Sequence, residues 1–584
     1  MTMTRTKAIL LALAIVGLVL FLTVCVAVFA AFGGAAKRAV AKGSILVIDL
    51  ERPLTEKGSR VPGIAGIFGD MSHPLPAYEA ASAIRSAGDD KRIAAILLRG
   101  GFNGSFASLD LLREALVDAR ASGKRIYAQL GSANERMLWL GSAADEIWLE
   151  PMGFVEFDGW FGDVLYFGDA LKELGVEVQV TRVGKYKSAV EPFMLGKMTD
   201  ENREQLTEMM RSIEGKILGD LGEARGLDVE QLKRWSRERG WFTAKAAVEE
   251  KLATHAEPYS ALLAKLREHA DVGVGDDLPE ITLTRYARSV RKSPKGGPGV
   301  RVIVADGEIV DGSNPAVIGG DDLAQELRDA REEEDTRAVV LRVDSPGGSA
   351  TASDVIRSEV LALKAAGKPV IVSMGSLAAS GGYWISANAD VIVAQPQTLT
   401  GSIGVFGMLP NVQELAEKYS LRAERVSTSP LAGLGSPWKR LDETQLALMQ
   451  GLVDEIYERF LDLVADGRKL DRERVHEIAQ GRVWTGARAL ELGLVDELGD
   501  LDRAIDIARE RAKLGSDAPV RYPEREMQWL DELIEELLEQ EGLAQSRVEH
   551  LRALSRFSQL AQAFAQLEGR PAILARLPFE VVVH

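Results

Sequence analysis

The chain has 584 residues, 46% of them hydrophobic, and a formal net charge of −16 at pH 7. That length predicts several domains with sizeable cores. The acidic balance argues against nucleic acid as a partner, because phosphate contacts need clustered Lys and Arg. The single cysteine, Cys25, excludes a disulfide within one chain and a cysteine metal site. The six histidines lack metal-ligand spacing, so we expect no metal or organic cofactor.

An uncharged apolar run from Ala8 to Ala36 is the first element of the chain. It is longer than the roughly 20 residues that span a bilayer and than the core of about 7–15 residues in a cleaved signal peptide. We therefore expect a retained transmembrane anchor. The flanking cations leave its orientation ambiguous, since they stand on both sides of the run: Arg5, Lys7, Lys37, Arg38 and Lys42.

From Ser44 onward the same order of elements occurs twice. The first half carries apolar runs at Ala94–Gly101, Arg125–Ser132 and Ala143–Pro151, with a helical stretch up to Ala121 between the first two. The second half repeats this order at Ala338–Gly348, Val370–Ser376 and Ala387–Pro396. Both halves end alike, because Trp241–Ala247 resembles Val483–Ala489. Apolar strands alternating with helices predict an α/β fold, here as two domains in tandem.

Three glycine-rich turns follow predicted strands of the second half. They are D-S-P-G-G-S (Asp344–Ser349), the stretch Ser373–Trp384, and T-G-S-I-G-V-F-G (Thr400–Gly407). A helix is predicted near Ser353–Ala366, with Gly367 as its stop. Together with the two strands that precede the first two turns, this helix forms a βαβ unit. Open α/β folds place ligands and chemistry at such strand ends. A single turn of this kind is a common connection between secondary-structure elements, but three within about sixty residues favour a functional site.

Ser380 is the candidate nucleophile of this stretch, since Gly381 and Gly382 follow it and allow a substrate close to the backbone. Sliding one half onto the other sets Ser380 opposite Glu135 or Arg136, so the first half has no serine nucleophile. The first half instead carries two lysines in V-G-K-Y-K-S-A-V-E-P-F (183–193). The matching second-half region, 425–435, has no lysine. If the two halves arose by duplication, and one then lost the serine while the other lost the lysine, the remaining serine and lysine would form one composite site.

The second-half turns together resemble signal peptide peptidase of the long, tandem-repeat bacterial type (the protease IV family). The residues that carry this resemblance are D-S-P-G-G-S, A-A-S-G-G-Y-W-I-S and T-L-T-G-S-I-G-V-F-G, and it extends over roughly residues 44–512. The resemblance implies two Clp protease/crotonase-like domains behind one transmembrane helix. It also implies a Ser-Lys endopeptidase that degrades cleaved signal peptides and other unfolded apolar peptides. The family's members are anchored in the bacterial inner membrane lipid with a periplasmic body, and a homotetramer is expected.

The resemblance also assigns roles to individual residues. A serine hydroxyl needs a positioned base, and Lys187 matches the family's base in Y-K-S-A-V-E-P-F, so we favour it over Lys185. Burial would lower its pKa enough for that task. Ser402 resembles the family's supporting hydroxyl. Backbone N–H groups of Gly381 and of Gly347 or Gly348 are the candidate oxyanion donors, and the sequence does not choose between the last two.

These observations divide the chain into six expected segments: a cytoplasmic start (1–7), the anchor (8–36), an N-terminal repeat domain (44–292), a linker (293–299), a C-terminal repeat domain (300–512) and a helical tail (513–584). In the tail, Leu530, Leu533, Ile534, Leu537 and Leu538 form an apolar stripe at helical spacing. Two other functions stay open at this stage: an acyl-CoA enzyme of the crotonase type, and a membrane scaffold of the same fold without activity.

Overall fold

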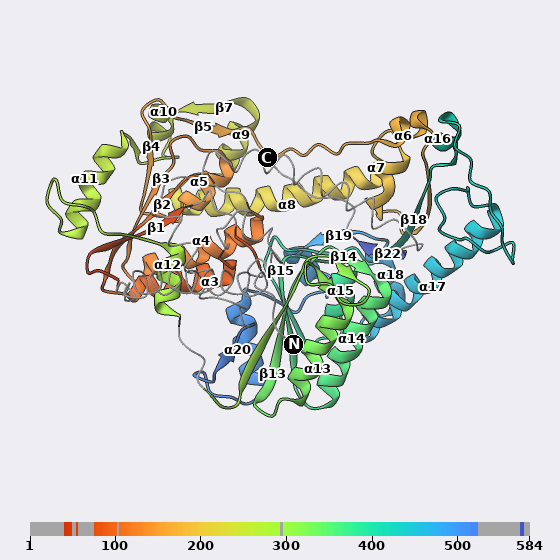
Figure 1. Cartoon of the computed structure of the whole chain (residues 1–584). Coiled ribbons are helices and arrows are strands. Elements are labelled where there is room, and N and C mark those ends of the chain that lie inside the picture. Colours follow the sequence, from red (N-terminus) through yellow and green to blue (C-terminus); the bar gives the residue numbers. More distant parts are fainter. Residues whose placement is uncertain are drawn as a thin grey trace, which may run out of the picture.

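The computed structural model describes residues 40–49, 54–56, 75–101, 104–291, 296–523 and 573–576. Within them the chain forms two α/β lobes, and the long helix α8 (Asp200–Arg225) runs between them (Figure 1). The predicted anchor, the apolar stripe of the tail and part of the linker lie outside the described residues. No helix of the described ranges is long and apolar enough to cross a bilayer.

The first lobe contains a six-stranded parallel sheet in the order β8-β4-β3-β2-β1-β9. Its strands are β1 (Ser44–Asp49), β2 (Ile93–Arg99), β3 (Arg125–Gln129), β4 (Glu146–Leu149), β8 (His255–Ala256) and β9 (Glu280–Thr282). The central strands are buried apolar runs, as a parallel sheet covered on both faces requires. The three runs predicted from the sequence are therefore strands.

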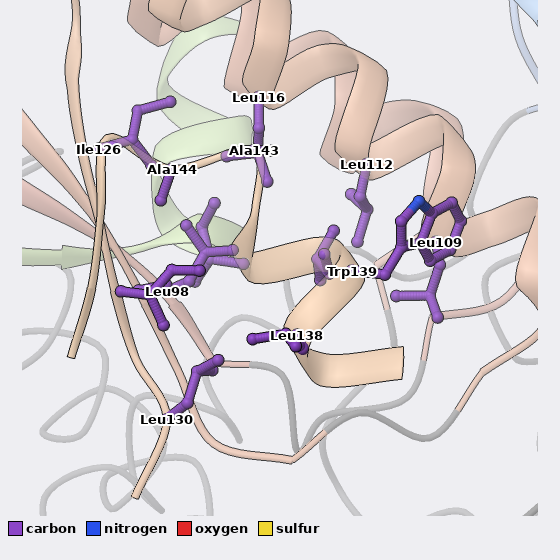
Figure 2. Packing of buried hydrophobic residues seen from close by; sticks show 14 of the residues in the cluster. Leu98, Leu109, Leu112, Leu116, Ile126, Leu130, Leu138, Trp139, Ala143 and Ala144 are labelled. Atoms are coloured by element: carbon purple, nitrogen blue, oxygen red, sulfur yellow. The ribbon is translucent and has the colours of Figure 1, made fainter. Parts of the chain in front are cut away.

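Helices cover this first sheet. They are α3 (Ala77–Asp89), α4 (Phe106–Ala121), α5 (Glu135–Gly141), α10 (Ala244–Glu249), α11 (Tyr259–Ala270) and α12 (Leu283–Val290). Figure 2 shows Leu109, Leu112 and Leu116 of α4 in one buried cluster that also contains Leu98 of β2 and Trp139 of α5. Ser105 begins α4 because its hydroxyl accepts a hydrogen bond from the Ser108 N–H.

The second lobe repeats this plan with a mostly parallel sheet in the order β19-β17-β15-β13-β10-β21, to which β16 and β20 are added. The strands are β10 (Gly299–Asp306), β13 (Thr336–Ser345), β15 (Val370–Ala379), β16 (Val391–Ala394), β17 (Leu399–Gly401), β19 (Val483–Thr485), β20 (Glu497–Leu498) and β21 (Val520–Arg521). Its helices include α13 (Gly320–Glu332), α14 (Ala350–Ala365), α15 (Gly381–Ser386), α19 (Gly486–Glu491) and α20 (Leu501–Arg511). The helix predicted near Ser353–Ala366 is α14.

One hydrogen bond recurs at the same place in both lobes. The Asp145 carboxylate accepts a 2.8 Å hydrogen bond from the Ile126 N–H at the start of β3. The Asp390 carboxylate accepts a 2.8 Å bond from the Val370 N–H at the start of β15. An aspartate before the next strand thus fixes equivalent strands in both halves, which supports a duplicated fold.

A third sheet joins the two halves, in the order β12-β11-β14-β22-β18-β6. Its strands are β6 (Glu177–Val183), β11 (Ile309–Val310), β12 (Ile318–Gly319), β14 (Gly347–Ser349), β18 (Val405–Asn411) and β22 (Ile573–Arg576). Strand β6 of the first half pairs antiparallel with β18 of the second half over seven residue pairs. This pairing carries the chain after β6 into the second lobe.

The remaining elements extend the lobes. Strands β5 (Phe154–Phe157) and β7 (Gly240–Thr243) form a separate antiparallel pair. The helices are α6 (Gly168–Leu174), α7 (Glu191–Met194), α9 (Val229–Glu238), α16 (Gln413–Lys418), α17 (Glu443–Arg468) and α18 (Arg472–Ile478). Helix α17 contacts both β6 and β18, so it supports the joint between the halves.

Candidate active site

Ser380 lies at the sharp turn between β15 and α15. Its backbone has φ 55° and ψ −115°, a conformation that is uncommon for a residue with a side chain. The turn is held on both sides, because the Ser380 N–H donates to the Gly401 carbonyl (2.9 Å) and the Ser380 carbonyl accepts from the Trp384 N–H (2.8 Å). Ser380 is fully buried within the chain. Such strain, maintained by the surrounding structure, is typical of functional turns.

The two glycines after Ser380 allow the first glycine-rich turn to approach. A Cβ at Gly381 would lie 2.7 Å from Ser353 Oγ and 3.1 Å from the Gly348 nitrogen. A Cβ at Gly382 would lie 2.8 Å from the Ser345 carbonyl oxygen. A side chain at Gly382 would displace the backbone, and one at Gly381 would crowd Ser353 and the P-G-G turn, so packing as well as chemistry favours the S-G-G sequence.

Lys187 of the first half reaches Ser380 of the second. Its Nζ lies 2.8 Å from Ser380 Oγ, 3.0 Å from Ser402 Oγ and 3.1 Å from the Ser402 carbonyl oxygen. The whole Lys187 side chain is buried. The structure therefore brings together the three residues singled out from the sequence, although 193 residues separate the lysine from Ser380.

The loop that carries Lys187 is pressed against glycines of the second half. A Cβ at Gly481, where φ is +75°, would lie 2.6 Å from Lys187 Cβ, and one at Gly404 would lie 3.3 Å from Lys187 Cδ. The Tyr186 N–H donates to the Gln480 carbonyl at 2.9 Å. Any side chain at Gly481 would therefore displace the lysine loop.

Burial lowers the pKa of the Lys187 ammonium well below its ordinary value, because desolvation disfavours the charged form. The nearest polar atoms are serine oxygens rather than a carboxylate that would restore the charge. A neutral amine has two N–H donors and one lone pair. The amine can therefore donate to Ser402 and still accept the Ser380 hydroxyl proton.

Ser402 stands between β17 and β18 in a left-handed conformation, φ 50°. Its N–H donates to the Arg482 carbonyl at 2.7 Å, which anchors the turn T-G-S-I-G to the end of the second repeat. Both its hydroxyl and its carbonyl face Lys187 Nζ, so this turn orients the amine.

Lys185, the other lysine of the motif, does not reach Ser380. It is exposed, and its Nζ lies 5.0 Å from the centre of the Tyr186 ring, a cation–π distance. Of the two lysines, Lys187 is therefore the one that lies against Ser380.

The first half holds no hydroxyl where the second half holds Ser380. Helix α5, the counterpart of α15, begins with Asn134 as N-cap and Glu135 as its first residue. Burial raises the pKa of Glu135 to about 7, and its carboxylate accepts a hydrogen bond from the Gly159 N–H at 3.1 Å. Arg136 lies over the Phe106 ring. The equivalent turn of the first half therefore contributes packing contacts and carries no serine nucleophile.

The P-G-G turn presents two glycines beside Gly381. The Gly347 N–H donates to Ser345 Oγ at 3.2 Å. Gly348 (φ +151°) pairs with Ile309 of β11, and a Cβ there would collide with the Ile309 carbonyl oxygen at 1.9 Å. Among the described residues no group of three or more His, Cys, Asp or Glu has a geometry that could hold a metal ion.

A buried polar network beside Lys187 was not found from the sequence. It comprises Ser188, Glu191, Asn202 and Gln205, all at most 3% exposed. Asn202 and Gln205 lie on α8, and the only sequence signal was two amides among charged residues after the Thr199 N-cap. That signal does not distinguish a buried helix face from an exposed one.

The comparisons with known proteins agree with this geometry. Peptidase family S49 matches residues 118–273 and 362–515, once in each half. Protease 4 of Salmonella typhi is 38% identical over 497 residues, which cover 82% of this chain and 80% of that protein. The chloroplastic serine protease SPPA of Arabidopsis thaliana is 29% identical over 486 residues, covering 81% and 70%. The putative signal peptide peptidase SppA of Enterococcus faecium is 35% identical over 197 residues, covering 34% and 57%.

Proposed function

Because this chain belongs to peptidase family S49 and is a serine protease, we propose that it is a membrane-anchored endopeptidase that degrades cleaved signal peptides. In this proposal Ser380 is the nucleophile and Lys187 the general base. The observation that carries the assignment is the 2.8 Å separation of Lys187 Nζ and Ser380 Oγ in a site where burial lowers the pKa of the lysine. The acyl-CoA and scaffold alternatives do not explain relatives that are proteases.

The reaction follows from these two groups. Neutral Lys187 Nζ takes the Ser380 hydroxyl proton while Oγ attacks the peptide carbonyl, which forms a tetrahedral intermediate. The ammonium then gives its proton to the leaving amine, and the C–N bond breaks to leave an ester on Ser380. Water then gives a proton to the same amine and attacks the ester carbonyl. The ammonium returns that proton to Ser380 Oγ as the ester C–O bond breaks and the acid leaves. Ser402 holds Nζ beside Ser380 in both protonation states, because its hydroxyl oxygen accepts a hydrogen bond from the amine or the ammonium.

The developing oxyanion needs backbone donors. Gly381 follows the nucleophile at the start of α15, where helix N–H groups lack intrahelical partners. The Gly347 N–H is already bonded to Ser345 Oγ, which favours Gly348 as the second donor. Both sites lie next to each other, since the Gly381 Cβ position is 3.1 Å from the Gly348 nitrogen.

The peptide would bind as an extended strand between β14 and β18. These strands are parallel to each other and separated by the width of one strand, and β22 of the chain's own tail fills that place antiparallel to both. β22 pairs with Gly347–Ser349 on one side and with Phe406 and Gly407 on the other. Main-chain pairing of this kind accepts many sequences and leaves alternate side chains to enter pockets, which suits degradation of varied apolar remnants.

The wider setting is part of the same proposal. Residues 8–36 would anchor the chain in the bacterial inner membrane lipid, with the body on the periplasmic side. Both repeats would have the Clp protease/crotonase-like arrangement, and the protein would assemble as a homotetramer. The relative from Enterococcus faecium carries the name of a putative signal peptide peptidase, which supports this substrate class.

Hydrolysis by the detergent-solubilised full-length protein tests the substrate class. We expect a synthetic signal peptide to be cut at internal bonds by the wild type and left intact by Ser380→Ala, as followed by mass spectrometry. A folded globular protein without apolar extended segments serves as the control substrate. Cleavage of the folded control at the same rate as the peptide would contradict the proposed substrate class.

A further inference from the structure

Lys187 belongs to the first half of the chain, and Ser380 and Ser402 belong to the second. A composite site of this kind works only if the two halves are held in register to within a fraction of an ångström. The residues that contact the loop on both sides of Lys187 therefore affect catalysis even if they never touch substrate.

Gln205 on α8 is such a residue. Its side chain is 3% exposed. Its Nε2 lies 3.1 Å from the Tyr186 carbonyl oxygen and 2.9 Å from Ser188 Oγ, which are the two neighbours of Lys187. It also lies 3.0 Å from Asn202 Oδ1, which itself accepts a hydrogen bond from the Ser188 hydroxyl. The two amide protons are thus shared among three acceptors, two of which lie in the lysine loop on either side of the base.

The other end of the same amide bonds to the second half. Gln205 Oε1 accepts a hydrogen bond from the Val483 N–H at 3.3 Å. Val483 begins β19 and pairs with Gly401 of β17. Gly401 in turn accepts the Ser380 N–H and directly precedes Ser402. Because a backbone N–H faces Oε1 and a backbone carbonyl faces Nε2, only one orientation of the amide satisfies both partners.

We propose that Gln205 is a positioning residue. It fixes Lys187 against Ser380 across the two halves and helps to exclude water from the Lys187 amine. This proposal rests on the function proposed above. It assigns to one buried amide the task of joining the base loop to β19, which pairs with the strand that carries Gly401, the hydrogen-bond partner of Ser380.

The charged groups around this loop are engaged with each other. Arg182 of β6 lies 3.6 Å from Glu191 of α7. Arg482 donates to the Tyr186 hydroxyl and pairs with Glu204 of α8 and with Glu208, which lies one turn further along that helix. A change at Gln205 therefore acts on Lys187 through position and hydration rather than by releasing one of these charges.

Two variants test the proposal in the full-length protein. Gln205→Ala removes all these bonds, and Gln205→Glu keeps the volume and the acceptor for Val483 but loses both donors to the lysine loop. We expect kcat to fall at least about tenfold in both, with KM within about twofold, because misplacement by about 1 Å costs up to about 100-fold. In Gln205→Ala we also expect the acidic limb of the kcat–pH profile to move to higher pH, because a better hydrated Lys187 regains part of its ordinary pKa. In Gln205→Glu the added carboxyl group moves the limb the same way through its charge when it ionises, so the alanine variant decides the effect of hydration.

Gln395→Ala is the matched control. Gln395 is also a buried glutamine (2% exposed) whose Nε2 joins the halves, by a 2.9 Å bond to the Ala107 carbonyl, but it does not contact the lysine loop. We expect this variant to lose stability without a shift of the acidic limb. Unfolding midpoints of all variants show which changes are structural.

The outcomes separate this inference from the proposed function. If Gln205→Ala and Gln205→Glu fold and keep the wild-type kcat and pH limb, Gln205 has no positioning role and the inference is wrong, while the dyad stands. The same conclusion holds if Gln205→Ala loses activity without moving the limb. If Lys187→Ala retains activity, the dyad itself is wrong and the proposed function must be revised.

Discussion

At the scale of residues, the site depends on two serines with positive φ and one buried lysine. Ser380 and Ser402 hold φ values of 55° and 50°, and each is fixed by a backbone hydrogen bond to a neighbouring segment. Lysine is seldom fully buried, and here burial lowers the pKa of the amine, as the proposed role of general base requires. Backbone strain and desolvation, which lower stability, thus accompany the reactive groups.

Replacement of Ser402 by alanine tests how the lysine is oriented. Ser402→Ala removes one of the two oxygens of residue 402 that face Lys187 Nζ and leaves the carbonyl. We expect kcat to fall about tenfold, equivalent to about 1.4 kcal/mol in the barrier, with little change in KM. Ser386→Ala is the control, since that buried serine donates to the Gly382 carbonyl instead. Equal kcat values for the two variants would show that the Ser402 hydroxyl does not orient the base.

The low pKa of Lys187 also predicts how stability depends on pH. Folding lowers the pKa, so the unfolded chain binds more protons than the folded chain between the lowered value and the ordinary lysine pKa of about 10.4. Within that window the unfolding free energy of the wild type should rise with pH relative to Lys187→Met, which has no titrating group there. Urea unfolding at several pH values measures the difference. Parallel curves for the two proteins would mean that the pKa is not shifted.

At the scale of elements, the third sheet creates the composite site. The β6–β18 pairing delivers the Lys187 loop to the second half, and β14 brings the P-G-G turn next to Ser380. The motifs predicted β13, α14, β15 and the turn of Ser380, because β-branched runs, helix stops and glycine turns are local signals. They did not predict this sheet. Gly347–Ser349 has little strand propensity, and β6 and β18 lie more than 200 residues apart, so their pairing is a long-range effect.

Strand β22 allows a prediction about the tail. Residues 573–576 lie between β14 and β18, so they compete with any peptide that binds there. The apparent affinity for the peptide is therefore reduced by the fraction of time that β22 occupies this place. Removal of residues 573–584 should therefore raise kcat/KM for a peptide substrate by severalfold. Removal of residues 577–584 alone leaves β22 in the chain and is the control. The prediction is refuted if both truncations have the same kcat/KM as the full chain.

At the scale of the whole molecule, the two halves share buried charge as well as the active site. The Arg342 guanidinium of β13 is 1% exposed and makes two 2.9 Å hydrogen bonds to Glu56, which precedes α3 in the first half. It also donates to Ser373 Oγ and to the Met374 carbonyl in β15. On the surface of the same joint, Arg85 of α3 pairs with Asp500 and Asp502. Ion pairs therefore cross between the halves in the interior as well as near the surface.

Loss of Glu56 should destabilise this joint strongly. Glu56→Ala leaves the Arg342 charge buried without a counter-ion, so we expect the unfolding free energy to fall by about 3–5 kcal/mol. Glu230→Ala removes the partner of Lys233 in an exposed pair and should cost about 0–1 kcal/mol. Denaturant unfolding of both variants gives the comparison, and similar small losses would show that the Glu56 pair does not hold the halves together.

The central claim is that one lysine and one serine from different halves form a single dyad. The most direct test is kcat for peptide hydrolysis across pH in the wild type and in Lys187→Ala, with Ser380→Ala as the blank. The account predicts that Lys187→Ala falls to the level of the blank while still folded, and that the wild type loses activity as pH drops through the lowered pKa of the amine. Near-normal activity of folded Lys187→Ala would contradict it, because the base would then be another group.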